Sequence, residues 1–146
     1  MKEIVTQKQK DKKINEAIKM VNDVVKLRLG VSKVHGVGVI AMRDIKRGEK
    51  LYATAVPVFL DIPYKKFNKF RPEISELILD RFPNVKTDKS HFMSPDTLMQ
   101  LYLNHSDKPN YDSNTDKATR KIKAGEEVLQ DYRQLKDYKK VFKWLK

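Results

Sequence analysis

The sequence predicts a mainly β fold with short helices, an α+β domain with a single core. β-branched runs separated by glycine turns fill residues 27–60, and a similar turn recurs near residue 124. Helical spacing of apolar residues is confined to the two ends of the chain and to short stretches between the turns. The length of 146 residues and the 40% of hydrophobic residues suit one domain.

The N-terminal segment, residues 1–25, is basic and is predicted to contain an amphipathic helix. Its apolar residues recur at spacings of three and four, which places them on one helical face: Ile14, Ala17, Ile18, Val21, Val24 and Val25. The spacing changes to two at Leu27 and Leu29, so we expect a strand there that ends at Gly30.

Two similar strand–turn–strand corners are predicted. Residues 31–60 indicate a strand, a glycine bend at Gly36 and Gly38, a second strand, a turn at 46–49 and a third strand. The stretch RDIKRGEKL (43–51) matches RKIKAGEEV (120–128) at Arg, Ile, Lys, Gly and Glu in the same register. Glycine supplies the positive φ that such turns need, so the similarity alone says little about function.

Short helices are expected between and after the corners. Residues 72–82 place four apolar side chains on one face: Ile74, Leu77, Ile78 and Phe82. Ser94 and Pro95 are typical of the cap and first residue of a helix, here reaching about Tyr102. Residues 133–146 form a basic, aromatic segment with helical spacing of Leu135, Tyr138, Phe142 and Leu145. That helix either docks on the core or lies on the surface.

Composition excludes several classes of protein. The chain has no cysteine, so we expect neither disulfides nor a thiolate-bound metal, and we assign no metal site. No apolar run resembles a signal peptide or approaches the ~20 residues of a membrane span. The expectation is a soluble intracellular protein, in the cytoplasm or in a host nucleus or nucleoid, that is neither secreted nor bound to a membrane.

The net charge of +12 lies mostly at the ends of the chain. Residues 1–30 carry eight basic and four acidic residues, and residues 133–146 carry six and one. Such tails attract nucleic acid or acidic protein surfaces through salt-sensitive fields, but they also serve solubility alone. Both interpretations stay open.

Two short segments are candidates for chemistry. Gly36-Val37-Gly38 is not a dinucleotide loop, because the third glycine is absent and a strand follows, so it is either a structural bend or a place of close ligand approach. Asn104 and His105, in YLNHSDKPN, are either a capped helix end with a core histidine or part of a site. Neither a cysteine nucleophile nor a strand–serine–helix elbow is present, which disfavours the usual hydrolases.

The order of three segments resembles the SET domain of protein lysine methyltransferases. These are VSKVHGVGVIAMRDIKRGEKLY, YLNHSDKPN and KIKAGEEVLQDY, and the resemblance covers about residues 26–132 with a variable insert at about 61–93. It implies a β-clip-like fold of several small sheets with a C-terminal pseudoknot, flanked by N- and C-terminal helices. In that fold the chain end is threaded through a loop, so that the Asn-His segment lies beside the Asp-Tyr segment.

The resemblance also implies a cofactor, S-adenosylmethionine, and a set of site residues. The backbone of Gly36, Val37 and Gly38 would meet the cofactor, and Asn104 and His105 would hold its amino-acid and adenine ends. Tyr132 matches the catalytic tyrosine and would contact cofactor and substrate. The family's cysteine-rich zinc cluster is missing, so the C-terminal helix must close the site, with Tyr138 and Trp144 as the aromatics expected at the cofactor. The lysine channel is assigned to Tyr102, Tyr132 and Tyr138.

These residue types suit methyl transfer. Moving a methyl group from a sulfonium to an amine needs alignment and exclusion of water, without a metal or covalent nucleophile. The amine must be neutral, and a tyrosine hydroxyl can orient it. In the insert, Tyr64, Phe67 and Phe70 are either a substrate-facing stripe or core, and we favour core. The Asp107-Lys108 order departs from the family pattern, although Pro109 and Asn110 keep the turn.

The sequence therefore predicts a histone-lysine methyltransferase or a methyltransferase for another basic, nucleic-acid-associated protein. The partner is a protein that carries the target lysine, and the composition also allows nucleic-acid attraction through the tails and a homodimer. The alternative is a catalytically inactive SET-fold module that binds nucleic acid or a protein through its basic tails. Retention of Asn104, His105 and Tyr132 favours the enzyme.

Overall fold

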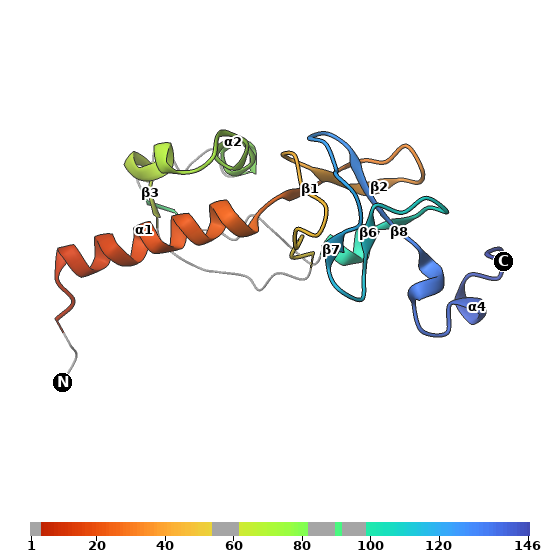
Figure 1. The fold of residues 1–146 in the computed structure, drawn as a ribbon. Coiled ribbons are helices and arrows are strands. Elements are labelled where there is room, and N and C mark those ends of the chain that lie inside the picture. Colours follow the sequence, from red (N-terminus) through yellow and green to blue (C-terminus); the bar gives the residue numbers. More distant parts are fainter. Residues whose placement is uncertain (1–3, 54–61, 82–89, 92–98) are drawn as a thin grey trace. The chain divides into compact units, whose positions relative to one another are not determined.

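The computed structural model describes residues 4–53, 62–81, 90–91 and 99–146. The chain divides into two compact units: unit 1 comprises residues 1–25 and 56–97, and unit 2 comprises residues 26–55 and 98–146 (Figure 1). The N-terminal segment thus shares a unit with the insert. The predicted domain boundaries after residues 25 and 132 stay predictions. Within the described ranges, no helix has the length and apolar character needed to cross a membrane.

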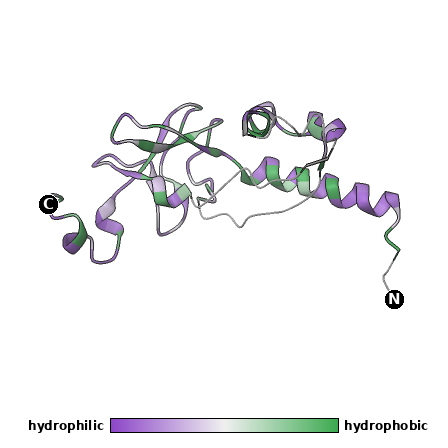
Figure 2. Cartoon of the chain, turned by 180° about the vertical axis from the view of Figure 1, so that it is seen from behind, coloured by the Kyte–Doolittle hydropathy of each residue, from purple (hydrophilic) through white to green (hydrophobic). Residues whose placement is uncertain are grey.

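Helix α1 (Gln7–Val24) of unit 1 begins seven residues before the predicted apolar stripe. A capping box explains the early start, because the Thr6 hydroxyl accepts the Gln9 N–H at 3.2 Å while the Gln9 side chain accepts the Thr6 N–H at 2.7 Å. The helix buries Ala17, Ile18 and Val21. Figure 2 shows hydrophobic bands between the hydrophilic ones along α1, as expected of a helix with one buried face.

The rest of unit 1 comprises β3 (Ile62–Pro63), the 3₁₀ helix η1 (Tyr64–Lys69), α2 (Pro72–Arg81) and β4 (Ser90–His91), which pairs antiparallel with β3. Asn22 fastens α1 to the end of η1: its amide donates to the Lys69 carbonyl and accepts the Arg71 N–H, both at 2.8 Å. Phe67 and Phe70 are buried, which agrees with core, whereas Tyr64 is 38% exposed.

Unit 2 is built on a four-stranded sheet in the order β1-β2-β8-β5. Strands β1 (Leu27–Val31) and β2 (Val37–Ala41) form a hairpin, β2 pairs antiparallel with β8 (Glu127–Gln130), and β8 pairs parallel with β5 (Asn104–His105). A second hairpin joins β6 (Tyr111–Asp112) to β7 (Lys117–Ala118). The predicted fold class, small sheets with few short helices, is confirmed, although β1 continues through Gly30 instead of ending there.

The two corners are confirmed, and we call residues 43–51 corner A and residues 120–128 corner B. Ile45 and Ile122 exchange both backbone hydrogen bonds, at 2.8 and 2.9 Å, and both side chains are fully buried. Gly48 and Gly125 have φ of 80° and 82°. In each corner the glutamate carboxylate accepts the backbone N–H of the lysine three residues earlier at 2.9 Å. The sheet and corners enclose the main core: Leu27, Val39, Ala41, Ile45, Leu51, Ala53, Met99, Leu103, Tyr111, Ala118, Ile122 and Val128.

Three sequence-based expectations need correction or lie outside the described residues. The strand expected after corner A shows one bridge, Lys50 with Lys117, and its continuation at 54–60 is not described. Of the helix expected from Ser94, only the 3₁₀ helix η2 (Met99–Tyr102) lies within the described residues, and Asn104 is in a strand, not at a helix end. In place of the expected C-terminal helix the structure has two short ones, η3 (Tyr132–Gln134) and α4 (Tyr138–Val141), because Asp137 between them has a left-handed backbone conformation.

Candidate functional site

The side chain of Asn104 holds the loop of the β1–β2 hairpin against β5. Asn104 is buried, and its amide nitrogen lies 3.1 Å from four acceptors: Ser32 Oγ, the carbonyl oxygens of His35 and Val37, and Glu127 Oε1. An amide NH₂ has two donors, so the four acceptors share them. The Asn104 side chain therefore holds the segment Gly36–Gly38 in place. The sequence motifs assign Asn104 and this segment to the same site.

Glu127 anchors the other side of this loop. Its carboxylate accepts the Ser32 hydroxyl at 2.7 Å and the Lys33 N–H at 3.3 Å. A Cβ at Gly38 would collide with this carboxylate, so the close approach demands glycine. Gly36 is glycine for a different reason, a φ of +52°. Ser32 and Glu127 were missed by the site assignment, although Glu127 is the second glutamate of the quoted Gly-Glu-Glu motif.

His105 and Gln130 are paired across the parallel strands β5 and β8, and each has one buried atom without a partner. His105 Nδ1 accepts the Tyr132 N–H at 3.1 Å, so in the neutral ring the proton is on Nε2. That Nε2 and Gln130 Oε1 make no hydrogen bond with a described residue. The His105 side chain is 10% exposed and Gln130 is 3% exposed. Unsatisfied buried groups are costly, so a ligand that supplied an acceptor and a donor would stabilise this arrangement.

Tyr132 lies two residues after the end of β8 and contacts His105. Its hydroxyl donates to the Leu103 carbonyl at 2.9 Å, and its ring centre is 5.3 Å from that of His105. Burial raises the pKa of Tyr132, so the hydroxyl is neutral at physiological pH. Its proton is committed to Leu103, which leaves the oxygen lone pairs as acceptors.

An ionic cluster borders His105 where the sequence departs from the family pattern. Arg133 Nε lies 2.8 Å from Asp131, and Arg133 Nη2 lies 3.1 Å from Asp107. The hydrogen bond from Arg133 lowers the pKa of Asp131. Asp107 Oδ1 is also 3.4 Å from His105 Nε2, without hydrogen-bond geometry. The cluster joins the segment after Tyr132 to the Asn104–Asn110 segment by ion pairs.

The aromatics of the C-terminal segment divide into two groups. Phe142 stacks near Tyr132 with ring centres 4.5 Å apart, and Trp144 lies 5.8 Å from His105 while remaining 65% exposed. Tyr138 makes no ring contact with His105 or Tyr132 in the described part of the chain, and its ring faces Lys139 at 5.9 Å. Tyr102 is 42% exposed, and its side chain makes no hydrogen bond or ring contact with a described residue. The roles assigned to these residues stay predictions.

The profile of the SET domain matches residues 36–133, more than half of the chain. The chain therefore belongs to the SET-domain family, whose members are in general protein lysine methyltransferases. A comparison with curated proteins found no match.

Similar solved structures include two of Polycomb repressive complex 2. The Chaetomium thermophilum complex is 19% identical with a TM-score of 0.42 over 83% of this chain and 18% of that one. The apo complex with mutations in Ezh2 is 20% identical with a TM-score of 0.42 over 81% and 16%. A Plasmodium falciparum protein, titled as a proposed histone methyltransferase, is 22% identical with a TM-score of 0.37 over 74% and 93%. This chain thus spans less than a fifth of the Polycomb chains.

Proposed function

We propose that this protein transfers a methyl group from S-adenosylmethionine to the side-chain amine of a lysine in a protein. Family membership supports the class of reaction, and the surroundings of Tyr132 support the site. The observation that carries the proposal is the Tyr132 hydroxyl, which is tied to Leu103 beside a histidine with an unpartnered nitrogen.

The residues present fit the cofactor. An adenine ring offers both acceptors and a donor, which complement the unpartnered His105 Nε2–H and Gln130 Oε1. The hairpin loop held by Asn104 and Glu127 has no side chain at Gly36, where no atom lies within 4 Å of the Cβ position, so the backbone there can approach a ligand closely. When bound, the cofactor supplies an electrophilic methyl group on a sulfonium. Asn104 would fix the loop at the amino-acid end, and Trp144 offers an exposed ring near His105.

The neutral hydroxyl of Tyr132 would orient the incoming amine. Its lone pairs can accept an N–H of the neutral lysine amine, while the Leu103 carbonyl keeps the hydroxyl in place. The amine loses its proton before the reaction, because only the neutral form is nucleophilic, and an apolar channel beside a sulfonium lowers its pKa. Phe142 packs on the Tyr132 ring and limits its movement. The proposed substrates are histones or other basic, nucleic-acid-associated proteins.

The direct test is the Tyr132→Phe variant, measured for cofactor affinity by calorimetry and for transfer of labelled methyl groups to histones and other basic proteins. We expect nearly unchanged affinity and a loss of transfer of at least about 100-fold, or about 2.7 kcal/mol in the transition state. Tyr64→Phe is the matched control, because it removes a tyrosine hydroxyl in unit 1. Full activity in Tyr132→Phe would refute the assignment of Tyr132.

A second test separates the enzyme from an inactive binding module. S-adenosylmethionine should raise the melting temperature of the wild type, since a ligand that binds only the folded state stabilises it. Asn104→Ala should weaken that binding about tenfold or more, while Asn114→Ala, a substitution at an exposed turn, should not. Absence of any shift at millimolar cofactor would favour the inactive module.

A further inference from the structure

In unit 2, Lys50 and Lys117 lie directly opposite each other on antiparallel strands, at a position where cross-strand neighbours are closest. Lys50 bridges Lys117, and the flanking bonds run from the Leu51 N–H to Asp116 at 2.9 Å and from the Ala118 N–H to Glu49 at 3.0 Å. This is the non-hydrogen-bonded antiparallel arrangement, with Cα atoms about 4.5 Å apart and side chains on the same side. Like charges placed directly opposite destabilise a sheet, so folding does not explain the pair.

Three further cations lie in the turns of the two corners, Lys46 and Arg47 in corner A and Lys123 in corner B. Lys46, Arg47 and Lys123 are exposed and, like Lys50 and Lys117, form no ion pair with a described residue. We call these five residues the corner cations.

The nearby carboxylates are engaged elsewhere. Asp116 accepts the N–H groups of Tyr52 and Ala53 and the Tyr111 hydroxyl. Asp112, opposite Lys117 in the β6–β7 hairpin, accepts from Asn114 and Thr115. Glu49 accepts the Lys46 N–H and lies 3.5 Å from the buried Lys26.

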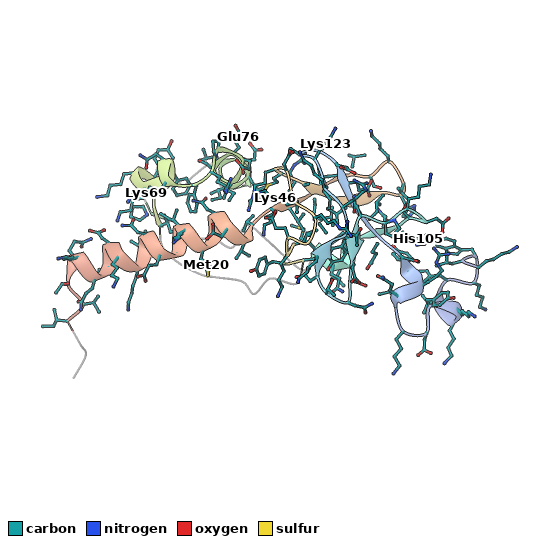
Figure 3. The ribbon with its side chains drawn as sticks, in the orientation of Figure 1. Met20, Lys46, Lys69, Glu76, His105 and Lys123 are labelled. Atoms are coloured by element: carbon teal, nitrogen blue, oxygen red, sulfur yellow. The ribbon has the colours of Figure 1, made fainter. Side chains whose placement is uncertain are left out.

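The corner cations lie away from the proposed methyl-transfer site. Strands β2 and β8 run antiparallel, and the corners meet one end of this strand pair while the 32–38 loop and Tyr132 lie at the other. Figure 3 shows Lys46 and Lys123 on one side of unit 2 and His105 on the other. A ligand at the corners would therefore leave the site around Tyr132 open.

The residue types exposed on this surface indicate which class of partner it binds. Protein interfaces have an apolar centre, but among the described residues 43–53 and 116–126 the only exposed large apolar side chain is Tyr52. Its ring is itself covered by ammonium groups, those of Lys26 at 4.9 Å and Lys50 at 5.1 Å. Nucleic-acid backbones need cations and no apolar centre, and they present a negative charge about every 1.7 Å of duplex axis. We infer that the corner cations bind the sugar–phosphate backbone of nucleic acid, separately from any methyl transfer.

The test is the Lys50→Glu variant of the full chain with a fluorescently labelled 20-base-pair DNA duplex, measured by anisotropy over a salt series. Each phosphate contact contributes about 0.9 to the slope of log K against log salt, so we expect a slope smaller by about one and affinity at 0.1 M salt lower by about tenfold. The same variant should melt about 2–4 °C higher, because glutamate opposite Lys117 replaces repulsion by attraction.

Lys136→Glu is the matched control, since it makes the same charge change at an exposed position of the basic C-terminal segment. It should weaken binding less and leave the melting temperature without a rise. Equal losses in the two variants would overturn the corner site in favour of net charge or the tails. Equal affinity of the wild type for polyglutamate would overturn the choice of nucleic acid. DNA binding is measured without S-adenosylmethionine, so a failure to bind DNA can be distinguished from a failure of methyl transfer.

Discussion

Corner A and corner B have the same backbone hydrogen bonds but end in different side chains. Gly48 donates to Ala118 as Gly125 donates to Ala41, and each glycine is followed by a glutamate that folds back on its own turn. The next residue is Lys50 in corner A and Glu127 in corner B. Lys50 faces Lys117 on the surface, whereas Glu127 pairs with Ile40 in β2 and holds the loop that contains Gly38.

The equivalence of the two regions extends to a buried polar residue before each hairpin. Lys26 donates to the Lys50 carbonyl at 2.7 Å, and Asn110 donates to the Glu127 carbonyl at 2.8 Å. Both residues are at least 96% buried. The same backbone arrangement thus occurs twice: in corner A it carries the exposed Lys50, and in corner B it carries Glu127, which holds the β1–β2 loop. The two corners thus share a backbone geometry, and they differ in the single residue that follows the glutamate of each turn.

The largest effect should come from the point where both corners meet. Ile45→Ala or Ile122→Ala removes a fully buried side chain, so each should lower the free energy of unfolding by about 2–5 kcal/mol. The two losses should not add, because the residues are in contact. Chemical denaturation measures both, with Val31→Ala, 89% exposed, as the control. Additive losses would contradict a shared centre.

Exchanging the charges at Lys50 and Glu127, the residues after the two turn glutamates, should separate the functions proposed for the two corners. Glu127→Lys places a cation among three donors, from Ser32, Lys33 and Asn104, so we expect cofactor affinity to fall about 100-fold, or about 2.7 kcal/mol. Lys50→Glu, the reverse exchange, should leave that affinity unchanged. Calorimetry on both folded variants decides, and a similar loss in the two would contradict the division between corners.

Local signals predicted the parts of the fold that depend on neighbouring residues. The corners were predicted because RDIKRGEKL and RKIKAGEEV need the same positive φ at glycine, and the segments around Asn104 and Tyr132 were predicted because the family motif is continuous. The role of Glu127 was missed, since it depends on the pairing of Ile40 with Glu127, which brings residue 127 over Gly38. Helical spacing placed Tyr138 and Phe142 on one stripe. Left-handed Asp137 interrupts that helix, and of the two aromatics Phe142 is the one that contacts Tyr132.

If alanine lowers the free energy of unfolding equally at the two turn glycines, the two corners have equivalent backbone turns. Gly48→Ala and Gly125→Ala each force a Cβ into a left-handed conformation, while neither Cβ would meet an atom within 4 Å. Each should therefore cost about 1 kcal/mol and lower the melting temperature by about 2–4 °C. Asparagine tolerates positive φ better, so Gly48→Asn and Gly125→Asn should cost less. A loss at one glycine alone would show that the turns differ in strain.

The smallest effect concerns acid stability, where corner B has an ion pair of its own. A hydrogen bond from Arg120 lowers the pKa of Glu126 from 4.5, and the two groups are 2.6 Å apart. Because the folded pKa is depressed, the resulting stability is present above pH 4.5 and is lost as pH falls through the lower, folded pKa. Both side chains are partly exposed, so screening by solvent limits the contribution of this pair to the free energy of unfolding to about 0.3–0.5 kcal/mol.

Arg120→Ala should make the melting temperature fall less steeply between about pH 5 and pH 3. Arg47→Ala in corner A should keep the wild-type slope, because Arg47 itself forms no ion pair with a described residue. A wild-type slope in Arg120→Ala as well would mean that the pair of Arg120 and Glu126 contributes nothing to folding at acid pH.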